Sequence, residues 1–276
     1  MITALRTEHD GRIYWTAIVT LIVSAWLALA WVGAGHVRFH WPAHPAHEPF
    51  ASMNPHRPAG SALGFAAHLS LFVGGWTLMT IGMMLPTSLP LITLFRAVVR
   101  RKRDSAALLV SLIVGYLATW VVFGAVVYLL ESALDALMGR IPLLATNAAY
   151  LGVGVLALAG IYQFTPLKDR CLEACRSPMS FLVEHWRDGS HTGGSDGTNA
   201  LRLGVHHGLF CLGCCWTLML LMVFVGGVNL GWMLALGAVM AAEKAAPWGR
   251  RLVVPVGATL LLAATMMILR MTGSVV

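Results

Sequence analysis

The amino-acid sequence predicts an all-α protein, a polytopic membrane helix bundle with about seven transmembrane helices and a cytoplasmic N-terminus. Of its 276 residues, 58% are hydrophobic and only 11% are charged, and the mean hydropathy is +0.74. Such a composition is typical of chains whose main solvent is lipid. Long runs without Asp, Glu, Lys or Arg alternate with short charged segments. Most runs reach the ~20 residues that a helix needs to cross the hydrocarbon core of a bilayer.

The charge-free runs define the expected spans. An uncleaved first helix is expected rather than a secretory signal peptide, because Glu8 and Asp10 accompany its basic residues and no clear cleavage site follows. The second run is long, so either its first residues lie in the interface or the helix is tilted and kinked at Pro86. The motif VGGVN at 225–229 is a turn signal that separates the fifth span from the sixth. In chain order the expected spans are 13–35, 62–94, 106–130, 146–164, 204–225, 230–246 and 252–269.

Basic residues predict the orientation of the bundle. Fifteen of the 19 Lys and Arg residues fall in segments that are cytoplasmic when the N-terminus is inside, and four fall outside. This distribution satisfies the positive-inside rule and predicts a multi-pass protein of the bacterial inner membrane. The net charge of +7 then reflects orientation and contact with the anionic lipid bilayer, so no nucleic-acid partner is expected. We expect one membrane domain over 1–276, with a His-rich outer loop at 36–60 and a cytoplasmic loop at 165–203.

The segment HHGLFCLGCCW, residues 206–216, concentrates reactive side chains inside a charge-free stretch from 203 to 242. A helix turns by about 100° per residue, so one face carries an imidazole, three thiols and two thioethers, while His206 points away. All five cysteines lie on the inner side of the predicted bundle, which favours reduced thiols for metal ligation or redox chemistry over structural disulfides. The residues on this face are His207, Cys211, Cys214, Cys215, Met219 and Met222.

Soft ligands within lipid favour a soft, monovalent metal ion. A buried charge is costly unless it is neutralised, and Cu(I) with one thiolate and neutral imidazole or thioether ligands is nearly neutral. Zn(II) would need two thiolates, so Cu(I) is favoured over zinc. A single cysteine or methionine is more typical of core packing, and this applies to Met219 and Met222. Three cysteines in five positions, one turn after a histidine, favour metal or redox chemistry instead.

Two further segments offer sulfur ligands. In WTLMTIGMMLP, residues 76–86, Met79 and Met83 share a helical face and Met84 is rotated by about 100°. These sulfurs would join the site if the second and fifth helices are neighbours, and a Met-rich packing face is the alternative. Cys171 and Cys175 are four residues apart, so a short helix after Pro166 would present both on one side for metal or thiol exchange.

Three other features have both a structural and a functional interpretation. The small-residue spacing of Gly204 and Gly208 would permit close approach of another helix. The five histidines of the outer loop fit recruitment of divalent copper or zinc, or an incidental role in a Pro-rich loop. At the end of the sixth helix, we expect Lys244 to extend to the lipid headgroups and Glu243 to pair locally or to serve the site.

Several catalytic motifs are absent from the sequence. It has no phosphate-binding glycine loop, nucleophile elbow or zinc-protease motif, and no CxxCH motif for haem attachment. A conventional hydrolase or ATP-driven pump therefore has no visible machinery, and a non-enzymatic role is favoured. Haem bound in another way stays open as a cofactor.

Four motifs together resemble a bacterial family of unknown function described as predicted metal-binding integral membrane proteins. They are WTLMTIGMMLP, YQFTPLKDRCLEACRSP, HHGLFCLGCCWTLM and GWMLALGAVMAAEKAAPWG. The resemblance runs from about Trp76 to Gly249 and leaves out the His-rich outer loop. It implies a metal site but says little about the activity. The site residues that it implies are Met83, Met84, Cys171, Cys175, His207, Cys211, Cys214, Cys215 and Glu243.

The leading hypothesis is an inner-membrane protein that binds Cu(I) and passes it across or along the membrane, to a membrane copper enzyme as partner. Cys211, Cys214 and His207 would be the core ligands, with Cys215 and Met83 as additional ones. The cysteine pair of the cytoplasmic loop would exchange metal at the entrance.

Two alternatives belong to other functional classes. The chain could be an accessory subunit of a larger membrane complex, in which the helices mainly supply packing surface. It could also be a thiol, haem-linked or quinone-linked oxidoreductase. Because a disulfide between the adjacent Cys214 and Cys215 would be strained, Cys171 or Cys175 would then have to reach Cys211 or Cys214.

Overall fold

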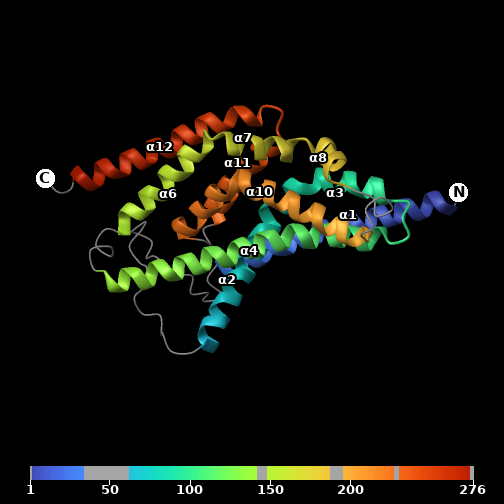
Figure 1. Ribbon diagram of the computed structural model, residues 1–276, viewed down its shortest axis with the longest axis horizontal. Coiled ribbons are helices and arrows are strands. Elements are labelled where there is room, and N and C mark those ends of the chain that lie inside the picture. Colours follow the sequence, from blue (N-terminus) through green and yellow to red (C-terminus); the bar gives the residue numbers. More distant parts are fainter. Residues whose placement is uncertain (1, 34–61, 142–147, 187–194, 227–229, 274–276) are drawn as a thin grey trace.

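The computed structural model describes residues 2–33, 62–141, 148–186, 195–226 and 230–273. Every regular element in these ranges is a helix, which confirms the predicted all-α class (Figure 1). The outer loop expected at 36–60 lies outside the described residues. The helices are α1 (Ile2–Gly33), α2 (Ala62–Met83), α3 (Leu85–Val99), α4 (Ser105–Arg140), α6 (Ala148–Gln163), α7 (Pro166–Arg176), α8 (Pro178–His185), α10 (Asp196–Gly226), α11 (Leu230–Ala245) and α12 (Gly249–Gly273).

Four helices in the described ranges are long and apolar enough to cross a membrane. A fifth crossing results if Tyr150–Gln163 and Pro166–Arg176 form one span, which bends by 64°. The apolar segments Trp15–Trp31 and Leu85–Val99 are shorter. Helix length and composition therefore support four or five spans, and the seven expected from charge spacing stay a prediction. The four are Gly64–Met83, Ser105–Arg140, Asp196–Val223 and Gly249–Thr272.

The run expected to form one span at 62–94 is two helices, which corrects that expectation. The kink anticipated at Pro86 is a full break, with this proline in the first turn of α3. Pro86 has no N–H to donate to the carbonyl of Gly82, so the helical hydrogen-bond ladder is interrupted. That carbonyl instead accepts a hydrogen bond from the Trp26 indole at 3.0 Å, which ties α1 to the break. Met84, between the two helices, is fully buried.

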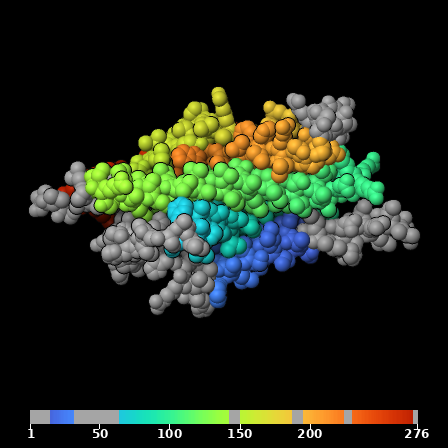
Figure 2. All heavy atoms as spheres, turned by 60° about the horizontal axis from the view of Figure 1, so that its bottom comes forward, coloured from blue at the N-terminus to red at the C-terminus, as the bar shows by residue number. Residues whose placement is uncertain are grey.

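The central helix is α10. In its apolar stretch 56% of the residues are buried, against 11% in α12. Its most extensive packing is on α4, and α2 packs on α4 as well (Figure 2). Glycine makes the α4–α10 contact possible, because a Cβ at Gly204 would collide with the Leu112 carbonyl and one at Gly115 with the Leu201 carbonyl. The close approach predicted at Gly204 is confirmed. The cysteines of α10 are thereby held inside the bundle.

The short helix predicted after Pro166 is confirmed as α7. Thr165 caps its N-terminus, since its side chain accepts a hydrogen bond from the Lys168 N–H at 3.3 Å, and Pro166 starts the first turn. The bend between α6 and α7 turns α7 onto α10, where it packs. The two cysteines of α7 therefore approach those of α10.

Candidate metal centre

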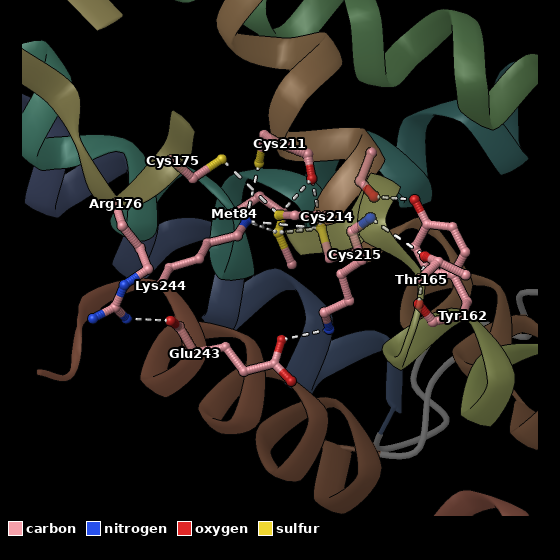
Figure 3. Close-up of polar contacts among 12 residues, drawn as sticks. Met84, Tyr162, Thr165, Cys175, Arg176, Cys211, Cys214, Cys215, Glu243 and Lys244 are labelled. Atoms are coloured by element: carbon pink, nitrogen blue, oxygen red, sulfur yellow. Dashed lines mark hydrogen bonds and ion pairs between the residues drawn. The ribbon is translucent and has the colours of Figure 1, made fainter. Parts of the chain in front are cut away.

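Sulfur atoms from three separate parts of the chain converge beside α10 (Figure 3). All five cysteines are free thiols, and those of α10 are each 1% exposed. The methionine at the break between α2 and α3 adds a thioether from the other side. The residues concerned are Met84, Cys171, Cys175, Cys211, Cys214 and Cys215.

Three of these sulfurs surround the ammonium group of Lys244, which reaches them from α11. Its Nζ lies 3.0 Å from Cys211 Sγ, 3.5 Å from Met84 Sδ and 3.7 Å from Cys215 Sγ. Cys215 Sγ and Met84 Sδ are themselves 3.7 Å apart. We call these three sulfur atoms the Lys244 sulfur group. Lys244 is only 7% exposed, so the expectation that it extends to the lipid headgroups is wrong. The long, flexible side chain of a lysine can point into the protein when buried polar groups lie close to its ammonium.

The α10 thiols differ in their hydrogen bonds. Cys214 and Cys215 both donate to the carbonyl of Cys211, at 3.1 and 2.9 Å. Cys211 Sγ instead lies 3.2 Å from the Tyr116 hydroxyl and 3.0 Å from Lys244 Nζ. Contacts with an ammonium and a hydroxyl favour negative charge on a sulfur. Cys211 is therefore the thiol best placed to become a thiolate ligand.

The α7 cysteines reach the same face of α10. Cys175 Sγ lies 4.0 Å from Cys214 Sγ. Cys171 packs on Gly213, where an added Cβ would come within 2.5 Å of its sulfur, so glycine allows this approach. Burial raises the pKa of the Cys171 thiol. The pKa of the Cys175 thiol is also raised, chiefly because its S–H donates toward the sulfurs of Cys211 and Cys214. Both α7 thiols are consequently protonated at neutral pH.

His207 lies next to this centre but has a different polar partner. Its Nε2 is 3.2 Å from Ser88 Oγ, and its Nδ1 has no hydrogen-bond partner among the described residues. The ring stacks on Tyr116 with centroids 5.6 Å apart and meets the Phe181 ring edge to face at 5.5 Å. Since the Tyr116 hydroxyl also contacts Cys211, this tyrosine links the imidazole to the Lys244 sulfur group.

The two neighbouring methionines point to different places. Met84 contacts Cys215, as described above. Met83 is directed at α11, and its Cε lies 3.0 Å from where a Cβ on Gly237 would be. The break at Pro86 explains why Met84, the residue rotated away on an ideal wheel, is the one that meets α10. A helical wheel assumes one continuous helix, and the chain has two here.

Glu243 lies beside Lys244 in sequence, but the two side chains point apart (Figure 3). The Glu243 carboxylate pairs with Lys168 of α7, with 2.7 Å between Nζ and Oε2, and the two side chains are 3% and 1% exposed. This ion pair joins α7 to α11 and so helps to hold the α7 cysteines near the Lys244 sulfur group. The metal-ligand role of Glu243 stays a prediction.

The structure thus brings some of the predicted site residues together and gives others separate partners. In the described part of the chain, no three His, Cys, Asp or Glu side chains already form an arrangement that could hold a metal ion. Cys175 contacts Cys214, and Cys215 contacts Met84, in each case through the sulfur atoms. Cys211 joins them through Lys244 Nζ, which it shares with Cys215 and Met84. His207, Met83 and Glu243 lie around them with the partners given above.

Sequence reasoning missed three residues of the centre. The sequence predicts a headgroup position for Lys244, and it does not single out Tyr116 or Lys168 as site residues. The one available signal was the position of Lys244 and Glu243 at the end of a long charge-free stretch, where a charge needs a partner. Nothing in the local sequence identifies Tyr116, because its contact with Cys211 depends on the packing of α4 against α10.

Comparison with known protein families gives a match over most of the chain. The family model named PpoB2, described as copper chaperone, matches residues 73–267. The matched range contains Met84, all five cysteines and Lys244, and it excludes the His-rich segment at 36–60. No curated protein and no solved structure matches the chain.

Proposed function

Because the chain belongs to the PpoB2 family of copper chaperones, we propose that it binds Cu(I) in a bacterial inner membrane and delivers it to a copper enzyme there. The observation that carries this proposal is the convergence of buried sulfurs from α10 and the α2–α3 break around a single cation, the Lys244 ammonium. Thiolate and thioether sulfurs are soft ligands that suit Cu(I). Because these sulfurs already surround one monovalent cation, the Lys244 ammonium, they can also surround Cu(I).

The membrane placement rests on the character of the helix surfaces. Four or five helices have the length and composition to cross a bilayer. Large apolar side chains also lie on their outward faces, for example Val122 of α4 at 63% exposure and Leu262 of α12 at 65%. Lipid would cover such faces at no cost, whereas water would not. The orientation with the N-terminus inside follows from the distribution of basic residues.

Copper would bind between sulfurs that are already close. We assign Cys211, Cys215 and Met84 as the inner ligands, with Cys214 next to them and His207 available from the Tyr116 side. Binding requires Lys244 to move out of the Lys244 sulfur group, so that the sulfurs can close on the metal. Met83 and Glu243 lie outside these inner ligands, since Met83 contacts Gly237 and Glu243 pairs with Lys168.

The α7 cysteines would pass copper to the α10 cysteines. Cys175 Sγ is 4.0 Å from Cys214 Sγ, so an ion held by one thiol has the next within reach. In the predicted topology α7 belongs to the cytoplasmic loop at 165–203, and Cys175 is partly exposed. Copper transferred along this pair would therefore start from the cytoplasmic side.

The test is elemental analysis of the full chain, purified anaerobically in mild detergent, beside a Cys211→Ser/Cys214→Ser variant. The expected result is near-stoichiometric copper in the wild type and its loss in the variant. An absorption spectrum of the same samples screens for haem. A metal-free protein, even after exposure to Cu(I), would contradict the proposal. Stable co-purification with a partner in both samples would then favour an accessory subunit.

One observation favours a second candidate, a thiol oxidoreductase. The 4.0 Å between Cys175 Sγ and Cys214 Sγ is short enough for a disulfide to form after a small movement. A reversible two-electron thiol couple in metal-free protein, lost in a Cys175→Ser variant, would support this reading. The family match favours copper handling.

A further inference from the structure

We infer that Lys244 makes the sulfur site selective for a monovalent cation over a divalent one. The inference rests on the proposed copper function and adds a determinant of specificity to it. Lys244 has no sulfur atom, and a protonated ammonium cannot coordinate a copper ion. Its Nζ nevertheless occupies the position between Cys211, Cys215 and Met84 where a soft cation would bind.

The partners of Lys244 indicate that its charge belongs to the site. In the described part of the chain it forms no ion pair with a carboxylate. The carboxylate nearest in sequence, that of Glu243, is paired with Lys168. Apart from the Lys244 sulfur group, its other polar contact is Thr87 Oγ1 at 3.5 Å. A buried ammonium needs a negative partner, and among these contacts only the two cysteine sulfurs can carry that charge.

Charge balance then separates monovalent from divalent ions. One thiolate and the ammonium are together neutral. A metal ion that enters the site displaces the ammonium, but Lys244 stays tethered to α11 by its four methylene groups, so its charge still repels the ion. This repulsion is twice as large for a divalent ion as for Cu(I). At a separation of about 7 Å and an effective dielectric constant of about 20, the difference changes the ratio of the two binding constants by more than about tenfold.

The experiment compares two metal ions on one protein. Dissociation constants for Cu(I) and Cd(II) are measured by competition with chelators, on the full chain purified in detergent without oxygen. The readout is the ratio of the two constants, which does not depend on the fraction of folded protein in a sample. The variants are Lys244→Leu, which removes the charge without adding a ligand atom, and Lys244→Arg, which keeps the charge. Lys102→Leu is the matched control, because it removes a partly exposed lysine that pairs with Asp196.

We expect Lys244→Leu to shift the ratio toward Cd(II) by about tenfold or more, and Lys244→Arg and Lys102→Leu to leave it unchanged. An unchanged ratio in Lys244→Leu would overturn the inference and leave copper binding by the wild type standing. A wild type without Cu(I) affinity would instead overturn the proposed function. If Lys244→Leu does not fold, Lys244→Gln provides the same test, because it removes the charge and keeps a polar side chain. No shift toward Cd(II) in that variant would again overturn the inference.

Discussion

Removal of one partner of the Lys168–Glu243 ion pair should destabilise the protein strongly. The two side chains are 1% and 3% exposed and their charged atoms are 2.7 Å apart. At an effective dielectric constant of about 20, the attraction at this distance is about 6 kcal/mol, part of which the desolvation of both groups offsets. Removal of one partner leaves the other as an unpaired buried charge, which typically lowers the free energy of unfolding by about 3–5 kcal/mol. We therefore expect Glu243→Leu and Lys168→Met each to lower the free energy of unfolding by about 3–5 kcal/mol.

The double variant Lys168→Met/Glu243→Leu is the matched control. It leaves no unpaired charge, and replacement of a buried pair by apolar side chains of similar volume is often nearly neutral. We expect its free energy of unfolding to return to within about 2 kcal/mol of the wild type. The assay is denaturant or thermal unfolding in detergent, followed by the monodisperse fraction in gel filtration. Single variants as stable as the wild type, or a double variant no more stable than either single one, would refute the reasoning.

The same double variant also separates two roles of Glu243. If Glu243 acts only by holding α7 against α11, the folded double variant binds copper at the wild-type stoichiometry. Loss of copper from a folded double variant would instead support the ligand role that the family resemblance implies. Copper is measured by elemental analysis on the gel-filtration peak, so that unfolded protein does not contribute.

Three further results are expected. Met84→Leu should weaken Cu(I) binding by about tenfold in a chelator competition, because a thioether beside Cys215 is lost, whereas Met83→Leu should not; equal effects would contradict the assignment. Gly204→Ala should destabilise by about 1–3 kcal/mol in thermal unfolding, because its Cβ meets a backbone carbonyl of α4, and Gly74→Ala, which meets nothing within 4 Å, should not. Cys175 should react slowly with iodoacetamide at neutral pH in metal-free protein, since its raised pKa keeps it protonated, and faster as the pH rises; mass spectrometry measures the rate, and fast labelling at neutral pH would contradict this.

The class of the protein and much of its helical organisation could be predicted from the sequence. Composition alone predicts long apolar helices, and this does not depend on how the helices pack. Pro166 after Thr165 is a local helix-start signal, and α7 begins there. Gly204 allows a close approach whichever helix takes it up. The cysteine spacing likewise put three thiols on one side of α10, because helical periodicity is a local property.

The break at 62–94 shows where local reasoning ends. Pro86 predicts the position of a kink, but the local sequence does not determine the direction of the helix that follows it. The structure directs Met84 at Cys215 and Met83 at Gly237, opposite to the preference that a continuous wheel gave. That choice depends on how α2, α3 and α11 pack, which involves contacts between residues far apart in the sequence.

The sequence by itself determined that this chain is all-α and apolar, and that its thiols are concentrated on one helix and one adjoining loop. Only the tertiary structure decided which groups meet those thiols. Lys244, Tyr116 and Met84 come from three other segments. Glu243 forms its ion pair with Lys168, so it does not neutralise the charge of Lys244. The physical reason is that a buried charge takes the partner that packing brings within about 3 Å, and sequence distance places no limit on that partner.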